Sequence, residues 1–323
     1  MRITRRDLAL GLAASVLMLA GAGCQSAAAP TGPALVKFGV VTDLHYANID
    51  PVKGGTRYYR DSIPKLRGAL AVFRAEEVDF VVELGDFKDQ VSPPLKPESK
   101  QETATLEFLK KIDGELREVG VPTWRVLGNH DMDSISKEQF FATAPNPGAE
   151  PANPCRSFTN GGIRFIILDA NHNPDGSDYC KGNYDWRKAS VPPAQLAWLE
   201  AELKSAAKNP VIIFLHQPLD ADLPAGQTVA NAAEVRKLLE AYGKVLAVFT
   251  GHEHAGHYSF NNGIHYCTMR GMIEMPYPET AFSVIEILPN LTILVHANGR
   301  EIGRELHAGK PGRELPKTAE PAK

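Results

Sequence analysis

Cysteine is scarce in this sequence, which has four among 323 residues. One of them, Cys24, lies near the N-terminus, so the rest of the chain can form at most one disulfide. Cys155 and Cys180 flank an Asn/Gly/Asp-rich segment and would pair in an oxidising compartment, or stay free. Cys267 lies in an apolar, strand-like run and is expected to be a buried small hydrophobe.

Positive charge is also not in surplus. The chain has 35 Lys and Arg against 38 Asp and Glu, a formal net charge of −3. Removing the first 24 residues would take away Arg2, Arg5, Arg6 and Asp7 and leave −3 − (3 − 1) = −5. A mildly acidic protein lacks the basic face that a nucleic-acid polymer requires. Any phosphate that it recognises is expected to be neutralised by metal rather than by lysine.

The sequence has no apolar run long enough to be a clear membrane span. Its longest, residues 8–22, has about 15 residues, whereas a spanning helix needs about 20. Arg5 and Arg6 precede it, which is typical of a twin-arginine export signal. We therefore expect residues 1–30 to be a signal and the protein to reach the periplasm or cell envelope.

Two alternatives remain open for the fate of this segment. Cys24 follows Ala22-Gly23 as in a bacterial lipoprotein processing site, and a lipid on Cys24 would attach the protein to a membrane. Gly21, however, stands where such sites usually have leucine. The other alternative is release of a soluble protein after Ala29.

Strand-like and helix-like patterns alternate through most of the chain. Expected strands are 36–41, 80–84, 124–127, 156–159, 163–168, 211–215, 245–249, 257–260, 265–270, 281–288 and 291–297. Expected helices are 61–77, 98–119, 136–142, one starting at Pro193, and 232–242. The pattern predicts an α/β fold over residues 31–307, a four-layer α/β/β/α sandwich of two facing mixed sheets. Residues 308–323 are rich in Pro, Lys and Glu, which predicts a disordered tail.

Short polar clusters stand where five of the hydrophobic runs stop. They are Asp43-Leu44-His45, Gly85-Asp86, Gly128-Asn129-His130-Asp131, His216 and Gly251-His252-Glu253-His254. Side chains at the ends of neighbouring strands converge on one rim of a sheet. If the first strand continues, Asp43 and His45 share a face and reach one ion.

Carboxylate, amide and imidazole groups in one small volume form the ligand set of a two-metal hydrolase. Mixed nitrogen and oxygen ligation suits Mn²⁺, Fe or Zn²⁺ better than Ca²⁺ or a structural zinc. Both oxygens of Asp86 can serve two ions at once, so Asp86 is the expected bridge. Neither Ser190 nor Ser205 has the setting of a nucleophile, and Ser/His/Asp hydrolysis has no support.

The five clusters, in this order, resemble the calcineurin-like metallophosphoesterase superfamily over residues 36–297. The resemblance implies a first metal held by Asp43, His45, Asp86 and His254. It implies a second metal held by Asp86, Asn129, His216 and His252. A hydroxide shared by the two ions would then attack the phosphorus of a small phosphorylated substrate.

His130 and Asp131 are the expected catalytic side chains. His130 follows the ligand Asn129 and would deliver a proton or hydrogen bond to the leaving oxygen, with Asp131 holding its ring in orientation. Tyr58, Tyr59, Arg60 and Glu274 resemble features of the manganese-dependent ADP-ribose/CDP-alcohol diphosphatase branch and are candidate substrate contacts. His45 departs from branch members that carry Gln there, which leaves the metal preference and substrate range open.

Three functions follow, in order of preference. The first is an exported two-metal phosphohydrolase acting on diphosphate links such as those of ADP-ribose or CDP-alcohols. The second is a broad phosphomonoesterase or phosphodiesterase. The third is a non-catalytic scaffold with the same fold, which the complete set of metal-ligand residues argues against. Oligomeric state has no signal in the sequence.

Overall fold

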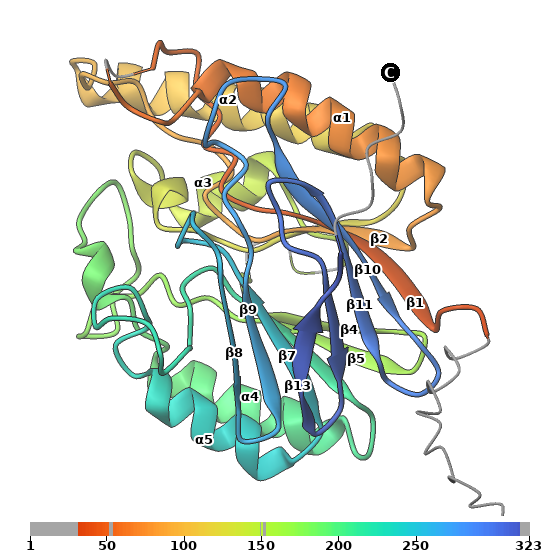
Figure 1. The fold of residues 1–323 in the computed structure, drawn as a ribbon. Helices are drawn as coiled ribbons and strands as arrows, with labels where there is room; N and C mark the ends of the chain where they lie inside the picture. The colour runs from red at the N-terminus through yellow and green to blue at the C-terminus, as the bar shows by residue number, and fades with distance from the viewer. Residues whose placement is uncertain (1–31, 52–53, 149, 151–152, 317–323) are drawn as a thin grey trace, which may run out of the picture. The chain divides into compact units, whose positions relative to one another are not determined.

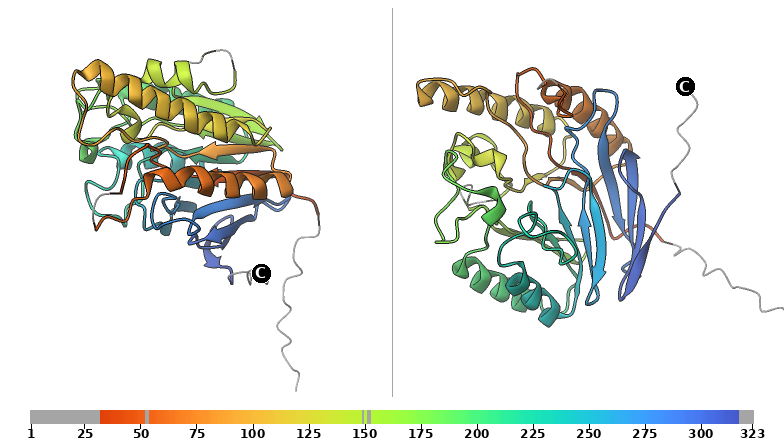
Figure 2. Two further views of the ribbon diagram at one scale, coloured as in Figure 1. Left: turned by 90° about the horizontal axis from the view of Figure 1, so that it is seen from above. Right: turned by 60° about the vertical axis from the view of Figure 1, so that its left-hand side comes forward.

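Two β-sheets pack face to face in this protein, and helices cover the outer face of each (Figure 1). The computed structural model describes residues 32–51, 54–148, 150 and 153–316. Figure 2 shows the same layers from two other sides, with α1 and α2 on one sheet and α4 and α5 on the other. The predicted four-layer α/β/β/α sandwich is confirmed.

The first sheet has seven strands in the order β13-β12-β11-β10-β1-β2-β3. Its strands are β1 Val36–Val41, β2 Phe80–Glu83, β3 Thr123–Arg125, β10 Ala281–Ile287, β11 Ile293–Gly299, β12 Arg304–His307 and β13 Lys310–Glu314. β1, β2 and β3 are parallel to one another, and the neighbours from β10 onward are antiparallel. The sheet is therefore mixed, as expected.

The second sheet has six strands in the order β4-β5-β6-β7-β9-β8. Its strands are β4 Arg156–Asn160, β5 Ile163–Ile167, β6 Val211–Phe214, β7 Val245–Thr250, β8 His257–Asn261 and β9 Ile264–Thr268. The four central strands are parallel, and β4 and β8 pair antiparallel at the two edges. Parallel strands covered on both faces read as continuous apolar runs.

Five α-helices follow the predicted segments closely. They are α1 Ser62–Ala75, α2 Glu98–Arg117, α3 Lys137–Thr143, α4 Pro193–Ser205 and α5 Ala232–Tyr242. Local chemistry sets several of their ends. Ser136 and Gln139 form a capping box at the start of α3. Gly243, at φ 72°, ends α5 in the left-handed conformation that suits glycine.

Side-chain alternation along the strands divides the core into layers. In β6, Ile212 and Phe214 point into the core between the sheets, whereas Val211 and Ile213 face the α4–α5 side. Phe38 and Phe80 stack in the inter-sheet core with ring centroids 4.9 Å apart. Truncating one such buried Phe to Ala costs about 3–5 kcal/mol. This core holds the strand ends in fixed register.

The predicted disordered tail was wrong for residues 308–316. β13 lies there and pairs antiparallel with β12 as a hairpin at the edge of the first sheet. Its Pro, Lys and Glu content predicted disorder, yet an edge strand such as β13 tolerates proline, here Pro311. The Gly312 amide donates to the Tyr258 hydroxyl of β8 at 2.6 Å, which ties the hairpin to the other sheet.

The disulfide that the sequence left open is not formed. Cys155 and Cys180 are free thiols, as is the buried Cys267. The amides of Cys155 and Cys180 donate to Asn153 and Asn183 in separate local turns. The proposed signal at residues 1–30, including Cys24 and Ala29, lies outside the described residues. None of the described helices has both the length and the apolar character to cross a membrane.

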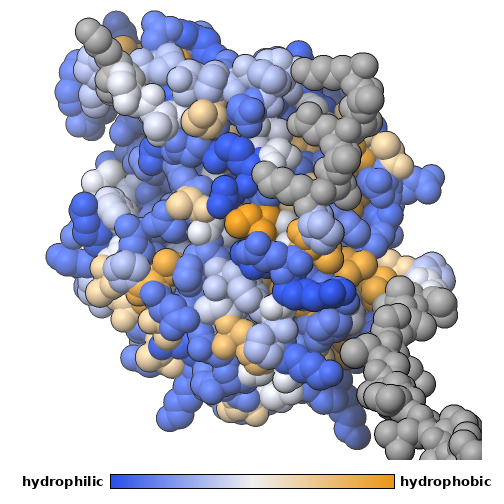
Figure 3. All heavy atoms as spheres, viewed as in Figure 1, coloured by the Kyte–Doolittle hydropathy of each residue, from blue (hydrophilic) through white to orange (hydrophobic). Residues whose placement is uncertain are grey.

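The surface view in Figure 3 is largely hydrophilic, with separate apolar patches between the polar side chains. Large hydrophobic residues that are exposed include Met275 and Tyr277, at 44% and 56%. Met275 ends the loop at residues 271–275 and Tyr277 follows it; this loop lies against the metal-ligand segment described below. Three large clusters of buried apolar residues fill the layers between the sheets and between sheets and helices.

Candidate metal centre

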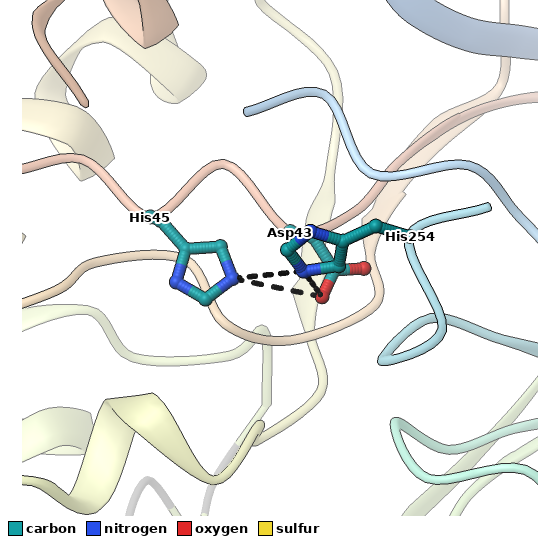
Figure 4. A group of neighbouring side chains, drawn as sticks. All are labelled: Asp43, His45 and His254. Atoms are coloured by element: carbon teal, nitrogen blue, oxygen red, sulfur yellow. Dashed lines mark hydrogen bonds and ion pairs between the residues drawn. The ribbon is translucent and has the colours of Figure 1, made fainter. Parts of the chain in front are cut away.

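The carboxyl ends of β1, β2, β3, β6 and β7 bring all seven candidate ligands to one rim. Among the groups of side chains there whose ligand atoms lie within 4.8 Å of one another, two consist of candidate ligands, and a third joins His45 to Asp89 and His130. The first consists of Asp43, His45 and His254, drawn in Figure 4. The second consists of Asp86, His216 and His252. Asp86 is added to the first group, so that both groups share it, and Asn129 is added to the second. We call the resulting sets of four residues position one and position two.

Position one is formed by Asp43, His45, Asp86 and His254. The Nε2 atoms of His45 and His254 lie 3.2 Å apart. Asp43 Oδ1 is 3.2 Å from His254 Nε2 and 3.8 Å from His45 Nε2. Figure 4 shows the two rings and the carboxylate directed at a common point. Three donor atoms from distant parts of the chain therefore converge.

Position two is formed by Asp86, Asn129, His216 and His252. Asp86 Oδ2 lies 3.2 Å from His216 Nε2, and the rings of His216 and His252 have centroids 5.2 Å apart. Asp86 Oδ2 is also 3.5 Å from His45 Nε2 of position one. One carboxylate oxygen thus lies beside a histidine of each set, as a bridging ligand must.

The backbone at these ligands is unusual. Asp43, His45, Asp86 and His252 have φ values of 50°, 47°, 55° and 70°, in the left-handed region. Non-glycine residues are uncommon there, and such strain clusters at functional sites. Our reason for pairing Asp43 with His45 was therefore wrong, because β1 ends at Val41 and the ligands lie on a loop. Asp43 and His45 nevertheless lie in one group of candidate ligands.

Two glycines permit close approach of the chain around these ligands. A Cβ on Gly85, at φ 100°, would lie 2.6 Å from His216 Nδ1. A Cβ on Gly251 would lie 2.1 Å from the Thr42 hydroxyl and 2.6 Å from Asp43 Oδ2. Only a residue without a side chain fits either place.

Three of the four histidine ligands have a partner on the ring nitrogen that faces away from the metal positions. His45 Nδ1 contacts Asp89 Oδ2 at 3.3 Å, and His254 Nδ1 contacts Glu274 Oε1 at 2.7 Å. His216 Nδ1 donates to the Leu84 carbonyl at 2.8 Å. Such contacts fix the tautomer and leave Nε2 free to bind a metal.

The buried polar atoms support metal binding at position two. Asn129 Oδ1 and His216 Nε2 are inaccessible and form no hydrogen bond with any described residue. Leaving a buried polar atom unpaired costs about 1–3 kcal/mol. A cation bound between them would satisfy both atoms, so the residues present fit a metal at this position.

Charge is concentrated at the centre. Burial alone would raise the pKa of Asp43, but His254, His45 and His216 together outweigh burial and hold that pKa well below its usual range. Burial lowers the pKa of His254, yet Asp43 and Glu274 raise it to about 9. Burial and the nearby His216 lower the pKa of His252 to about 3.

His130 lies beside the centre, but its partner is not the expected one. Its Nδ1 contacts Asp133 Oδ2 at 2.8 Å. Asp131 accepts instead from the amides of Asp86 at 3.0 Å and Gly128 at 2.9 Å. Asp131 therefore holds together the loops after β2 and β3, and Asp133 orients His130. The sequence did not indicate Asp133, because both carboxylates are near His130 in sequence. The 3₁₀ turn His130–Met132 brings Asp133, and not Asp131, to the imidazole ring.

The residues of the Tyr58 segment do not lie where the sequence suggested. Tyr59 is buried against Ala47 and Ile273, and Arg60 donates to Asn48 and Asp50 on the surface. Tyr58 is held by its backbone amide, which donates to the Ile273 carbonyl. None of the three is among the residues that line the cavity described below.

Glu274 contacts a candidate ligand of position one. It contacts His254, and its loop is tied down by the buried Lys65, whose Nζ donates to the carbonyls of Met272 and Met275 at 2.9 and 2.6 Å. The amide of Ile273 also donates to the Asp43 carbonyl. The loop thus links two ligands of position one.

A cavity of about 310 Å³ opens over the two positions. Its lining includes metal ligands together with His130 and Glu253. Three further lining residues were absent from the sequence prediction: Arg57, Trp186 and Gln227. They lie on loops outside the polar clusters, and no motif marked them.

Comparisons with known proteins agree with this geometry. The sequence model of the calcineurin-like phosphoesterase family matches residues 36–256. The chain is 26% identical over 307 residues to the manganese-dependent ADP-ribose/CDP-alcohol diphosphatase of Oryza sativa subsp. japonica, covering 81% of this chain and 91% of that protein. It is 24% identical over 300 residues to the enzyme of the same name from Arabidopsis thaliana, covering 81% and 94%.

The fold also matches a solved structure. A dimetal phosphatase from Danio rerio superposes with a TM-score of 0.71 at 22% identity. The match covers 85% of this chain and 99% of that one.

Proposed function

The chain belongs to the calcineurin-like phosphoesterase family, and on this premise we propose that it hydrolyses diphosphate bonds in nucleoside diphosphate-linked substrates such as ADP-ribose and CDP-alcohols. That it is a metal-dependent hydrolase follows from the family and its relatives. The narrower substrate class is supported by the names of the relatives that cover most of the chain. The single observation that carries the proposal is the pair of ligand sets that share Asp86 beneath one cavity.

Position one and position two would hold two metal ions, which when bound activate a water and polarise phosphoryl oxygens. Mn²⁺ is the first candidate, with Fe and Zn²⁺ as alternatives, because both sets mix imidazole with oxygen donors. Phosphoryl transfer depends mainly on positioning and charge neutralisation. Asp86 contributes by fixing the two sets relative to each other.

His130 is the residue placed to give a proton to the leaving oxygen. It lines the cavity, and its amide donates to Asp86 Oδ1 at 2.7 Å. Burial lowers the pKa of His130, but Asp133 and Asp86 outweigh burial and raise it to about 10. The ring, paired with Asp133 and lining the cavity, is placed to act as a general acid. Asp133 positions the ring that does so.

The test is a substrate panel on mature protein reconstituted with Mn²⁺, Fe or Zn²⁺. The panel contains ADP-ribose, CDP-choline, cyclic nucleotides and p-nitrophenyl phosphate. We expect the highest kcat/KM on the two diphosphates, with AMP and ribose 5-phosphate as products of ADP-ribose. Preference for cyclic nucleotides or p-nitrophenyl phosphate would instead establish a broad phosphodiesterase or phosphomonoesterase. Inactivity on the whole panel with every metal would favour a non-catalytic scaffold.

We also propose that residues 1–30 export the protein to the periplasm or cell envelope. Support comes from Arg5-Arg6 and the short apolar run that follows. Cell fractionation of the full chain, with Arg5→Lys/Arg6→Lys as the matched variant, tests export. Metabolic labelling with palmitate, compared with Cys24→Ala, separates a lipid anchor from soluble release.

A further inference from the structure

One loop that lines the cavity carries none of the candidate metal ligands. The segment from Tyr179 to Lys188 belongs to the second half of the chain but packs against the loop after β3. Tyr179 and Tyr184 stack with ring centroids 4.1 Å apart. The Tyr184 hydroxyl donates to the Asn129 carbonyl and to Asp133. The loop is thereby fixed to a ligand of position two and to the partner of His130.

This anchoring places an aromatic side chain on the cavity. Trp186 begins a 3₁₀ turn, Trp186–Lys188, and lines the cavity beside His252, with ring centroids 5.3 Å apart. The guanidinium of Arg187 lies over the indole, 4.2 Å from the ring centroid. An indole that is only partly buried and polarised by a cation is suited to stack on a flat, electron-rich ring.

The other lining residues distinguish the position-one side of the cavity from the position-two side. Gln227 adds an amide that can both donate and accept, as recognition of a base edge requires. Arg57 lies on the side of position one, since its Nη1 is 4.0 Å from Asp89, the partner of His45. Trp186 contacts His252 of position two. Arg57 and Trp186 therefore lie beside different metal positions.

We propose that Trp186, with Gln227, forms a nucleobase-binding subsite at the position-two side of the cavity. The inference rests on the proposed diphosphatase function and narrows it. The base of a nucleoside diphosphate-linked substrate stacks on Trp186, and the two phosphates of the substrate lie over the metal positions. The group esterified to the other phosphate, such as the ribose of ADP-ribose, extends toward Arg57. A cavity of about 310 Å³ is at the small end of the usual 300–1,000 Å³ for ligand sites.

The experiment measures binding of AMP and of ribose 5-phosphate to Mn²⁺-loaded protein by calorimetry. These two ligands differ only in the base. Stacking of one base on an aromatic side chain is worth roughly 5- to 150-fold in affinity. We expect the wild type to bind AMP more tightly than ribose 5-phosphate by a factor in that range. Trp186→Ala should bring the ratio of the two affinities close to one, and Trp186→Phe should restore most of it.

Trp198→Ala is the matched control, because Trp198 packs against the α4–α5 core and lines a different cavity. It should leave the AMP to ribose 5-phosphate ratio unchanged. Equal affinity of wild type for the two ligands, or an equal loss of both in Trp186→Ala, would overturn the subsite. Such a result alongside continued hydrolysis of ADP-ribose overturns the subsite alone. If the substrate panel finds no diphosphate hydrolysis, the proposed function itself fails.

Discussion

Position one and position two use similar ligands but are supported differently. At position one, carboxylates lie behind two of the histidines, Asp89 behind His45 and Glu274 behind His254. At position two, His216 is backed by a neutral carbonyl, and Asn129 Oδ1 has no hydrogen-bond partner among the described residues. Carboxylate partners raise the basicity of a histidine ligand. Position one is therefore expected to bind its ion more tightly.

The largest expected effect comes from removing the residue that both positions share. Asp86→Ala should reduce the metal content from two ions to none, because each set loses its bridging carboxylate. Activity should fall to that of the chelated protein. Metal analysis of purified protein checks this, and a variant that retains one ion would show that the two positions are independent.

His130→Ala should leave metal binding at both positions unchanged, although the ring centroids of His130 and His45 are 4.8 Å apart. Loss of a general acid lowers kcat by about 10²–10⁴-fold. Metal content should remain that of the wild type. Steady-state kinetics with parallel metal analysis separates the two roles, and a metal-free variant would contradict the assignment.

Asn129→Ala should weaken position two alone. It removes a neutral ligand whose oxygen has no other partner among the described residues. Titration with Mn²⁺ followed by electron paramagnetic resonance should show one tight ion, with the second bound too weakly to purify with the protein. Equal weakening of both ions would refute the difference between the two positions.

Glu274→Gln should weaken position one by about 10- to 100-fold, the usual effect of removing a partner of a histidine ligand. The same Mn²⁺ titration measures it. Glu200→Gln, on a surface pair of α4 with Lys204, is the control and should leave both affinities unchanged. If Glu274→Gln instead raises KM without changing metal affinity, the substrate contact first expected of Glu274 would be restored.

The smallest effect concerns stability away from either position. Hydrogen bonds from Arg67, with Lys111 adding to them, lower the pKa of Glu115 from 4.5 to about 2. A lowered folded-state pKa stabilises the protein above pH 4.5, and that stability is lost as pH falls toward 2. In chelated protein, Glu115→Gln should flatten this part of the curve of unfolding free energy against pH. An unchanged slope would show that the α1–α2 pair is screened by solvent.

Motif residues were predictable because each stands at the end of a hydrophobic run. Five runs and five polar clusters were sufficient to gather Asp43, Asp86 and His216 at one rim, and the structure does so. The orientation of His130 was not predictable. Asp131 and Asp133 are both near it in sequence, and only the turn between them decides which carboxylate faces the ring.

The aromatic and cationic lining of the cavity was also beyond the sequence. Trp186 belongs to an irregular loop with no periodic pattern, and Arg57 is one residue outside the Tyr58-Tyr59-Arg60 group that attracted attention. Which of these neighbours enters the cavity depends on the backbone of each loop and on its anchors.

The sequence by itself determined the layers, the metal-ligand residues and the class of reaction, because buried strands must be apolar and metal ligands must be polar where strands end. Tertiary structure alone decided which side chains support those ligands and which ones face the substrate. These roles depend on contacts between segments far apart in the chain, such as Lys65 with the loop after β9 and Tyr184 with Asn129. No local pattern of residues encodes a distance between two loops.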